Sequence, residues 1–225
     1  MRGKELNIYK ILLGLPLFQG MSVGDMENVI GHTRFDFSHF DKAEIIIRNS
    51  AACNALWFLT SGTVSVISCS DDKSYKVEEQ MQSPVMFQPE PLFGLTQRFT
   101  HNVVAKSRCD ILKIEKTEVV RLMGDYDIFR TNLMNILTTR CQRLLRRPWR
   151  PLPHSLRESI VRMIADRCVY PAGGKTLYIG MQQIANIIGA SRLKVSHELH
   201  SMQEDGLLTL QRQKIVIPAL ETLYI

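Results

Sequence analysis

The sequence lacks the features that mark membrane-spanning, secreted and disulfide-rich proteins. No apolar run approaches the roughly 18 residues that span a bilayer, and no small-residue cleavage site follows the basic N-terminus. The five cysteines are scattered, and none belongs to a C-x-x-C pair. An odd, unclustered set is typical of reduced thiols. We therefore expect a cytoplasmic protein with no membrane partner.

The common signatures of catalysis and metal binding are also missing. The sequence contains no G-x-S-x-G, P-loop, H-E-x-x-H or Gly-rich dinucleotide fingerprint, so we expect no catalytic residues and no enzyme. His197 and His200 have the spacing of a helical ligand pair, but no second pair is recognisable. We interpret them as solvent-facing residues and expect no metal.

What the sequence does contain is a basic C-terminal third. The 225 residues carry a formal net charge of +6, and their length suits one large domain or two modest ones. Residues 1–139 hold 15 Lys/Arg and 16 Asp/Glu, whereas residues 140–225 hold 13 Lys/Arg and 6 Asp/Glu. The first part is therefore nearly neutral and the second has a net charge of +7. This asymmetry indicates a polyanion-binding C-terminal part, although a solvated basic face remains the alternative.

Hydrophobic patterning predicts a β-rich N-terminal part. The first thirty residues have the pattern of helices, with Ser22 as a candidate N-cap. From residue 34 to residue 114, short alternating or apolar runs are separated by turn residues about every ten positions, which favours an antiparallel sandwich or barrel. These runs lie at 35–37, 45–47, 56–59, 63–67 and 103–105.

A long helix is predicted over residues 127–147, which contain neither glycine nor proline. Its apolar residues recur every three or four positions, which suits a seam between two copies of the chain. Packing on the chain's own β domain is the alternative, and both can hold together. Three prolines within 148–153 then end the helix and predict a hinge. The predicted dimer seam consists of Phe129, Leu133, Ile136, Leu137, Cys141 and Leu144.

Residues 181–200 have the spacing of two short helices around a tight turn. Ala185 allows a close approach of the helices, Gly189 accepts a left-handed turn conformation, and Val195 fills the angle between them. Ser191 is a candidate N-cap for the second helix. The spacing is that of a helix-turn-helix, and its place in the basic segment strengthens this interpretation.

Two short β-type runs follow, at 206–210 and 214–217. A hairpin at this position is the wing of a winged helix-turn-helix. It would bring Arg212 and Lys214 close to a phosphate backbone.

The order of these segments resembles the CRP/FNR family of bacterial transcription regulators. The N-terminal residues that carry the resemblance are Leu15–Phe18, Phe40–Ile46 and Leu56–Val64, and the C-terminal ones are Gln183–Arg192. The resemblance implies an α+β fold with an N-terminal antiparallel β-roll of the double-stranded β-helix or jelly-roll type and flanking helices. A long dimerisation helix and a C-terminal winged helix-turn-helix follow. It implies a β-roll sensor domain at 1–126, a dimerisation helix at 127–147, a proline hinge at 148–153 and a DNA-binding domain at 154–225.

The resemblance also implies the function of a sequence-specific transcription regulator. Its expected partners are double-stranded DNA, which it would bind as a homodimer at a palindromic operator, and RNA polymerase. Leu193 stands where many members have a glutamate, so it cannot accept a hydrogen bond from cytosine but can touch a thymine methyl. A sensor or scaffold protein whose C-terminal domain binds protein is the alternative. The expected DNA-binding residues are Gln182, Gln183, Ser191, Arg192, Lys194, Ser196, His197, Arg212 and Lys214.

The effector suggested by the resemblance is less well matched. In cyclic-nucleotide-binding members, a Gly-Glu pair holds the ribose and an Arg-Ser pair holds the phosphate. The corresponding residues here are Glu90, Arg98, Phe99 and Thr100, but Pro89 replaces the glycine and Phe99 takes the arginine position. Proline removes a backbone N–H from a loop that would present amides to phosphate. We therefore disfavour a cyclic nucleotide, expect no cofactor, and leave an unidentified small-molecule effector open.

Overall fold

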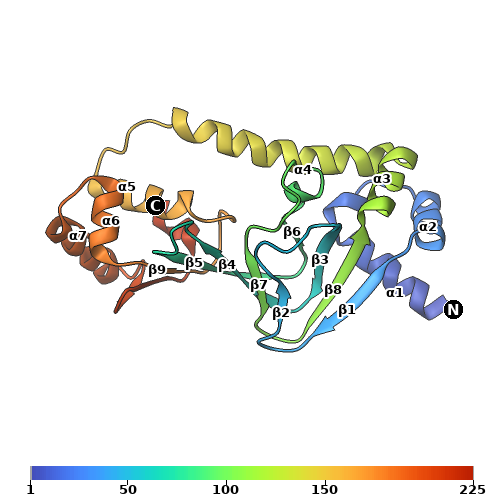
Figure 1. The fold of residues 1–225 in the computed structure, drawn as a ribbon, viewed down its shortest axis with the longest axis horizontal. Coiled ribbons are helices and arrows are strands. Elements are labelled where there is room, and N and C mark those ends of the chain that lie inside the picture. The colour runs from blue at the N-terminus through green and yellow to red at the C-terminus, as the bar shows by residue number, and fades with distance from the viewer. Residues whose placement is uncertain (1, 225) are drawn as a thin grey trace. The chain divides into compact units, whose positions relative to one another are not determined.

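Two groups of elements make up the structure, and each is described by itself. The computed structural model describes residues 2–224. The first unit comprises residues up to 64, together with 82–100 and 105–150, and the second comprises residues 65–81, 101–104 and 151–225. The elements are labelled in Figure 1.

Antiparallel strands form the centre of the first unit. Four of them make a sheet in the order β1-β8-β3-β6, in which β3 pairs with both β8 and β6. At the end of β3, Gly62 has a φ of +99° and lies so close to Arg108 that a Cβ atom would stand 2.4 Å from its carbonyl oxygen. Only glycine fits this turn. The strands are β1 (Asp36–Phe40), β2 (Ile45–Ile47), β3 (Ala55–Ser61), β6 (Val85–Phe87) and β8 (Cys109–Glu115).

Helices flank these strands at both ends of the first unit's sequence. Ser22 caps α2 by accepting a hydrogen bond from the backbone N–H of Asp25, as its sequence position predicts. Phe129 of α4 packs against Phe18, with ring centroids 5.3 Å apart. The helices are α1 (Arg2–Leu13), α2 (Val23–His32), α3 (Lys116–Asp125) and α4 (Asp127–Arg146), with 3-10 turns at Pro16–Phe18, Glu90–Leu92 and Arg147–Trp149.

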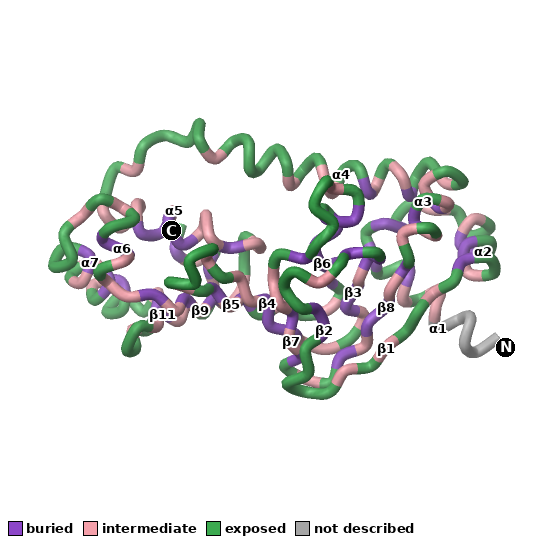
Figure 2. Tube along the Cα trace, in the orientation of Figure 1, coloured by how far each residue is buried: buried purple, intermediate pink, exposed green. Residues whose placement is uncertain are grey.

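The second unit combines three helices with an antiparallel sheet. Its strands follow the order β10-β11-β9-β5-β4-β7. Buried side chains of all three helices form one core with Leu177 of β9 and with Ile215 and Ile217 of β11 (Figure 2). The elements are β4 (Thr63–Cys69), β5 (Lys76–Gln82), β7 (Asn102–Ala105), α5 (Leu156–Asp166), β9 (Lys175–Tyr178), α6 (Met181–Ile188), α7 (Arg192–Glu204), β10 (Thr209–Gln211), β11 (Lys214–Ile217) and a 3-10 turn at Leu220–Tyr224.

The hairpin at residues 65–81 belongs to the second unit, although the sequence places it in the β-rich part. The hairpin joins the second unit because β5 pairs with β9, from Lys76 opposite Tyr178 to Glu79 opposite Lys175. The domain boundaries at 126, 147 and 153 stay a prediction. The fold class is confirmed: antiparallel sheets, helices and a C-terminal helix-turn-helix with a wing are all present.

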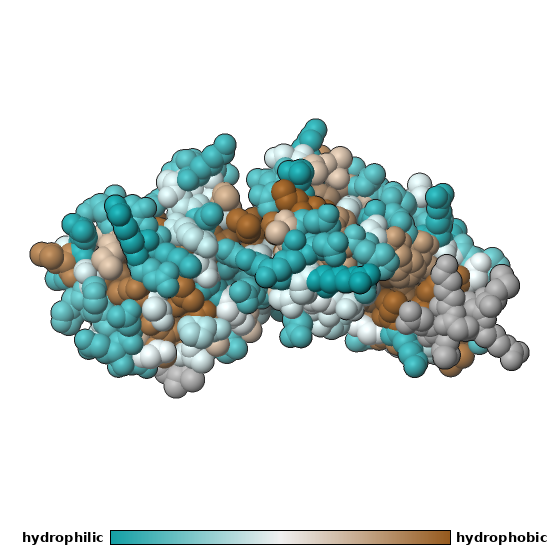
Figure 3. Space-filling model, turned by 90° about the horizontal axis from the view of Figure 1, so that it is seen from below, coloured by the Kyte–Doolittle hydropathy of each residue, from teal (hydrophilic) through white to brown (hydrophobic). Residues whose placement is uncertain are grey.

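The surface is mainly polar where Figure 3 displays it, with hydrophobic residues gathered in separate patches. None of the helices within residues 2–224 combines the length and the apolar character that crossing a membrane requires. Among the exposed apolar side chains, those on α4 and α7 bear on function.

Candidate nucleic-acid interface

The turn between α6 and α7 is built as its spacing predicts. Gly189 ends α6 in the left-handed conformation with a φ of +70°, and the backbone N–H of Ala190 donates to the carbonyl of Ala185 at 3.0 Å. The Ser191 hydroxyl then accepts a hydrogen bond from the backbone N–H of Lys194, which caps α7. These local interactions set the angle at which α7 leaves the turn.

One face of α7 is buried and the opposite face is exposed. Val195, Leu199 and Met202 are all fully buried against the core of the second unit. Because helical residues three or four apart share a face, the first two turns present Leu193 and His197 on the opposite side. Leu193 is 83% exposed, which is unusual for a leucine in a helix. Arg192, Lys194 and His200 are also exposed.

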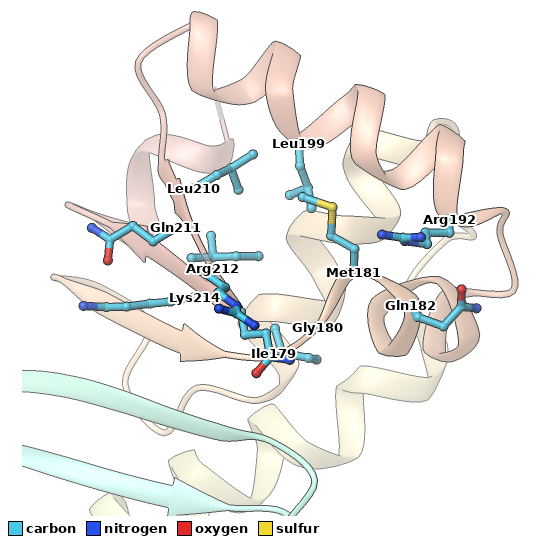
Figure 4. Close-up of a pocket in the computed structure, with 12 residues that line it drawn as sticks. Ile179, Gly180, Met181, Gln182, Arg192, Leu199, Leu210, Gln211, Arg212 and Lys214 are labelled. Carbon is cyan, nitrogen blue, oxygen red and sulfur yellow. The ribbon is translucent and has the colours of Figure 1, made fainter.

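A groove of about 550 Å³ lies between the start of α6, the start of α7 and the wing. Figure 4 shows Met181 and Leu199 between Arg192 and the wing strands. The rim of the groove carries the cations of Arg192, Arg212 and Lys214 together with the amide of Gln182. An apolar floor with a rim of cations and amides suits a phosphate backbone. The strands β10 and β11 pair from Thr209 opposite Val216 to Gln211 opposite Lys214, which confirms the predicted hairpin.

The structure distributes the predicted DNA-binding residues over three places. Gln182, Arg192, Arg212 and Lys214 line the groove. Ser191, Lys194 and His197 are exposed on α7, and Ser196 is half-buried beside them. Gln183 faces elsewhere, because its side-chain amide donates to the hydroxyl of Ser74 in the β4–β5 hairpin at 2.5 Å.

The sequence analysis did not identify Arg157, which binds the side of α7 that faces α5. Its guanidinium, on α5, binds Glu198 at 2.7 Å, Asp205 at 2.7 Å and the Ser201 hydroxyl at 3.0 Å. Hydrogen bonds to Glu198 and Asp205 raise the pKa of Arg157. The carboxylate of Glu198 thus faces Arg157 rather than Arg192. Local sequence patterns carry no signal for this pair, because the two residues are 41 positions apart.

In the first unit, the residues at the effector positions already have partners within the chain. Glu90 forms an ion pair with Arg140 of α4, and Arg98 donates to the carbonyl of Ser50 at 2.7 Å. The side-chain oxygen of Gln88 accepts from the backbone N–H of Thr100 at 2.8 Å and from its hydroxyl at 2.9 Å. Phe99 is only 3% exposed and packs edge-on against Trp57.

The predicted dimer residues of α4 divide into two groups. Phe129 and Leu133 are buried in the chain's own core, so they have no surface to offer a second copy. This corrects their assignment to the seam and follows the alternative that the helix packs on its own domain. Ile136 and Leu137 are half-buried, whereas Cys141 and Leu144 are exposed.

Comparisons with known proteins identify both parts of the chain. Residues 37–126 match the model of the cyclic nucleotide-binding domain, and residues 156–224 match the Crp-like helix-turn-helix domain. The chain belongs to the CRP/FNR family of transcription regulators. It is accordingly a DNA-binding transcription regulator, and the protein-binding scaffold has no support.

One curated protein and two solved structures, the latter showing likeness of fold, are similar to this chain. The cAMP-activated global transcriptional regulator Vfr of Pseudomonas aeruginosa is 25% identical over 181 residues, which cover 76% of this chain and 84% of Vfr. The catabolite activator protein of Thermus thermophilus has a TM-score of 0.50 at 17% identity, covering 93% of this chain and 97% of that one. The c-di-GMP responsive regulator CLP of Xanthomonas campestris has a TM-score of 0.51 at 21% identity, covering 88% and 99%. CRP-like regulators of this type bind DNA and act as dimers.

Proposed function

We propose that this regulator binds an imperfect palindromic operator as a homodimer and has no catalytic activity. One α7 from each copy would enter successive major grooves about 34–36 Å apart. The observation that carries this proposal is the uncovered outer face of α7 beside a groove with a basic rim. Base edges are read from such a face, and the groove suits the adjoining phosphates.

The outer face of α7 determines which bases the regulator reads. Leu193 would contact a thymine methyl, because its apolar side chain is 83% exposed on the outer face of α7. Lys194, Ser196 and His197 would supply the polar contacts to bases. Arg192 would bind a phosphate or a guanine from the edge of the groove.

The exposed half of α4 would form the dimer seam. Met134 and Leu144 are 54% and 57% exposed, and Cys141 lies between them at helical spacing. These residues share one face of the helix. Leu137, three residues after Met134, would lie on the same face, whereas Ile136 lies about 120° away around the helix, on the side of the buried Phe129 and Leu133.

The β-roll would not use a cyclic nucleotide, although the relative Vfr is described as cAMP-activated. A nucleotide would have to break the Glu90–Arg140 ion pair to reach the carboxylate. It would also have to displace Gln88 from the amide and hydroxyl of Thr100. Phe99, at the position of the phosphate-binding arginine, is apolar and buried. We therefore propose control by another small molecule, with contact to RNA polymerase once the dimer is bound near a promoter.

Selection of duplexes from a random pool, followed by a salt titration, tests the DNA-binding part. We expect the selected sequences to contain two inverted half-sites, and log K to fall with log salt with a slope of about −0.9 per neutralised phosphate. Arg192→Ala should weaken binding, whereas Arg48→Ala, which removes an exposed arginine of the first unit, should not. A single half-site, or equal effects of the two changes, would contradict the proposal.

Calorimetry with cAMP and cGMP tests the effector part. We expect no heat of binding for the unmodified protein at millimolar nucleotide. Micromolar binding of either nucleotide would overturn this part and leave the DNA-binding part intact.

A further inference from the structure

The β4–β5 hairpin is joined to the winged helix by strand pairing. On its own, the wing sheet β10-β11-β9 would end at β9. Instead β5 pairs along the outer edge of β9 over four consecutive residue pairs. An edge strand presents a row of unpaired backbone groups, which a docking strand satisfies. The hairpin therefore docks by β-strand addition within one chain.

A buried ion pair anchors this docking. The ammonium of Lys175 lies 2.7 Å from the carboxylate of Glu79, and both side chains are fully buried. Glu79 also accepts from the backbone N–H groups of Val169 and Tyr170, and Lys175 donates to the carbonyl of Ala172. A buried charge is stable only when it is paired and hydrogen-bonded. The pair thus holds one register of β5 on β9.

The turn of the hairpin reaches a residue that is expected to contact DNA. Ser74 accepts the side-chain amide of Gln183, in the first turn of α6, at 2.5 Å. On the neighbouring strand, the Tyr178 hydroxyl donates to Glu78 at 3.0 Å. The ring of Tyr178 also lies 5.7 Å from the ammonium of Lys214, a residue of the wing. The docked hairpin therefore contacts the start of α6 directly and the wing through Tyr178.

The negative charge of the hairpin would repel a phosphate near Gln183. Residues 65–81 contain four carboxylates and two lysines, whereas the other residues of the second unit contain eight Lys/Arg and six Asp/Glu. Asp72 is ionised at neutral pH, and hydrogen bonds from Ser70 and Ser74 lower its pKa to about 2. A phosphate that approached Gln183 would meet the Ser74 hydroxyl, which already accepts from the Gln183 amide, and the carboxylate of Asp72 beside it.

We propose that the β4–β5 hairpin is an autoinhibitory latch, which covers the start of α6 while it is docked on β9 and must leave for full DNA affinity. Release would expose Gln183 and remove the hairpin's negative charge from the phosphate path. The proposal rests on DNA binding through α6 and α7 but needs neither the palindrome nor the dimer.

A disulfide across β5 and β9 tests the latch directly. Glu78 and Thr176 are directly opposite, where Cα atoms in antiparallel pairs are about 4.5–5.5 Å apart, within the disulfide range of about 4.4–6.8 Å. The variant E78C/T176C would be made in a C69S/C141S background, because these are the exposed native cysteines. Its affinity for a duplex selected with the unmodified protein would be measured oxidised and after reduction.

We expect the oxidised variant to bind at least tenfold more weakly, with affinity restored on reduction. The matched control H39C/D110C joins β1 to β8 in the first unit and should bind equally in both states. Equal affinity of oxidised and reduced E78C/T176C would overturn the latch. Selection of no duplex by the unmodified protein would instead overturn the DNA-binding role of α7.

Hydrogen exchange of the unmodified protein gives a second test that needs no variant. We expect the selected duplex to speed amide exchange at Glu78 and Gln80 of β5 and at Thr176 and Tyr178 of β9. These amides face the junction between the two strands, in the alternation set by the hydrogen bond from the Gln80 N–H to the Gly174 carbonyl, and that pairing must open. Unchanged or slower exchange at these amides would overturn the latch even if the cysteine variant failed to fold.

Discussion

Loss of one partner of the Glu79–Lys175 pair should destabilise the second unit strongly. Lys175→Met removes the ammonium and leaves a fully buried carboxylate that keeps only the N–H groups of Val169 and Tyr170. Breaking a buried pair by removing one partner costs about 3–5 kcal/mol. For a unit of roughly 100 residues, that lowers the Tm of its transition by roughly 12–40 °C, at about 4–8 °C per kcal/mol. Lys194→Met, which removes an exposed lysine of the same unit, should change stability by less than about 0.5 kcal/mol.

A double variant separates the charge from the hydrogen bonds. E79Q/K175M has no buried charge and keeps one side-chain oxygen, in place of the two oxygens that accept from Val169 and Tyr170. It should therefore cost less than K175M alone, because the penalty of an unpaired buried charge is gone. Additive costs of the two single changes would refute this reasoning.

Urea unfolding with two probes assigns the effect to the right unit. Both tryptophans, Trp57 and Trp149, lie in the first unit, so their fluorescence follows that unit alone. Far-ultraviolet circular dichroism follows the helices of both units. K175M should move the part of the dichroism change that comes from the second unit to a lower urea concentration. The fluorescence transition of the first unit should stay at the same urea concentration. A cost below about 1 kcal/mol would show that the pair does not anchor the hairpin.

Three further predictions concern other parts of the chain. Arg157→Ala should weaken DNA binding by about 1–2 kcal/mol, since charge-assisted hydrogen bonds orient α7; the duplex titration measures this, and Arg157→Lys should recover part of the loss. Phe129→Ala should cost about 3–5 kcal/mol in the tryptophan-fluorescence transition, because its ring is fully buried against Phe18. The folded-state pKa of Asp72 is about 2, below its unfolded value of about 3.9. The stabilising contribution of this carboxylate is therefore present above the unfolded value and is lost as pH falls toward 2. A carboxyl NMR titration measures the folded-state pKa. An ordinary pKa for Asp72 would refute the hydrogen bonds from Ser70 and Ser74.

Much of the interface was predictable because its signals are local. Gly189 and Ser191 shape the turn through their own backbone preferences, and the spacing of Val195 and Leu199 is the periodicity of one helical face. The division of α4 was not predictable in the same way. Phe129 and Cys141 belong to one apolar stripe, and only the position of Phe18 shows that the first is buried.

By itself, the sequence determined the fold class, the order of β-rich part, long helix and winged helix-turn-helix, and the concentration of positive charge in the last third of the chain. Each follows from residues that are close together in the chain. The tertiary structure decided that Arg157 holds Glu198, that Arg140 engages Glu90 and that Glu79 lies buried beside Lys175. The partners in these ion pairs are 41, 50 and 96 residues apart. No local propensity encodes such a pairing, because it depends on which strand edges and helix faces meet when the chain folds.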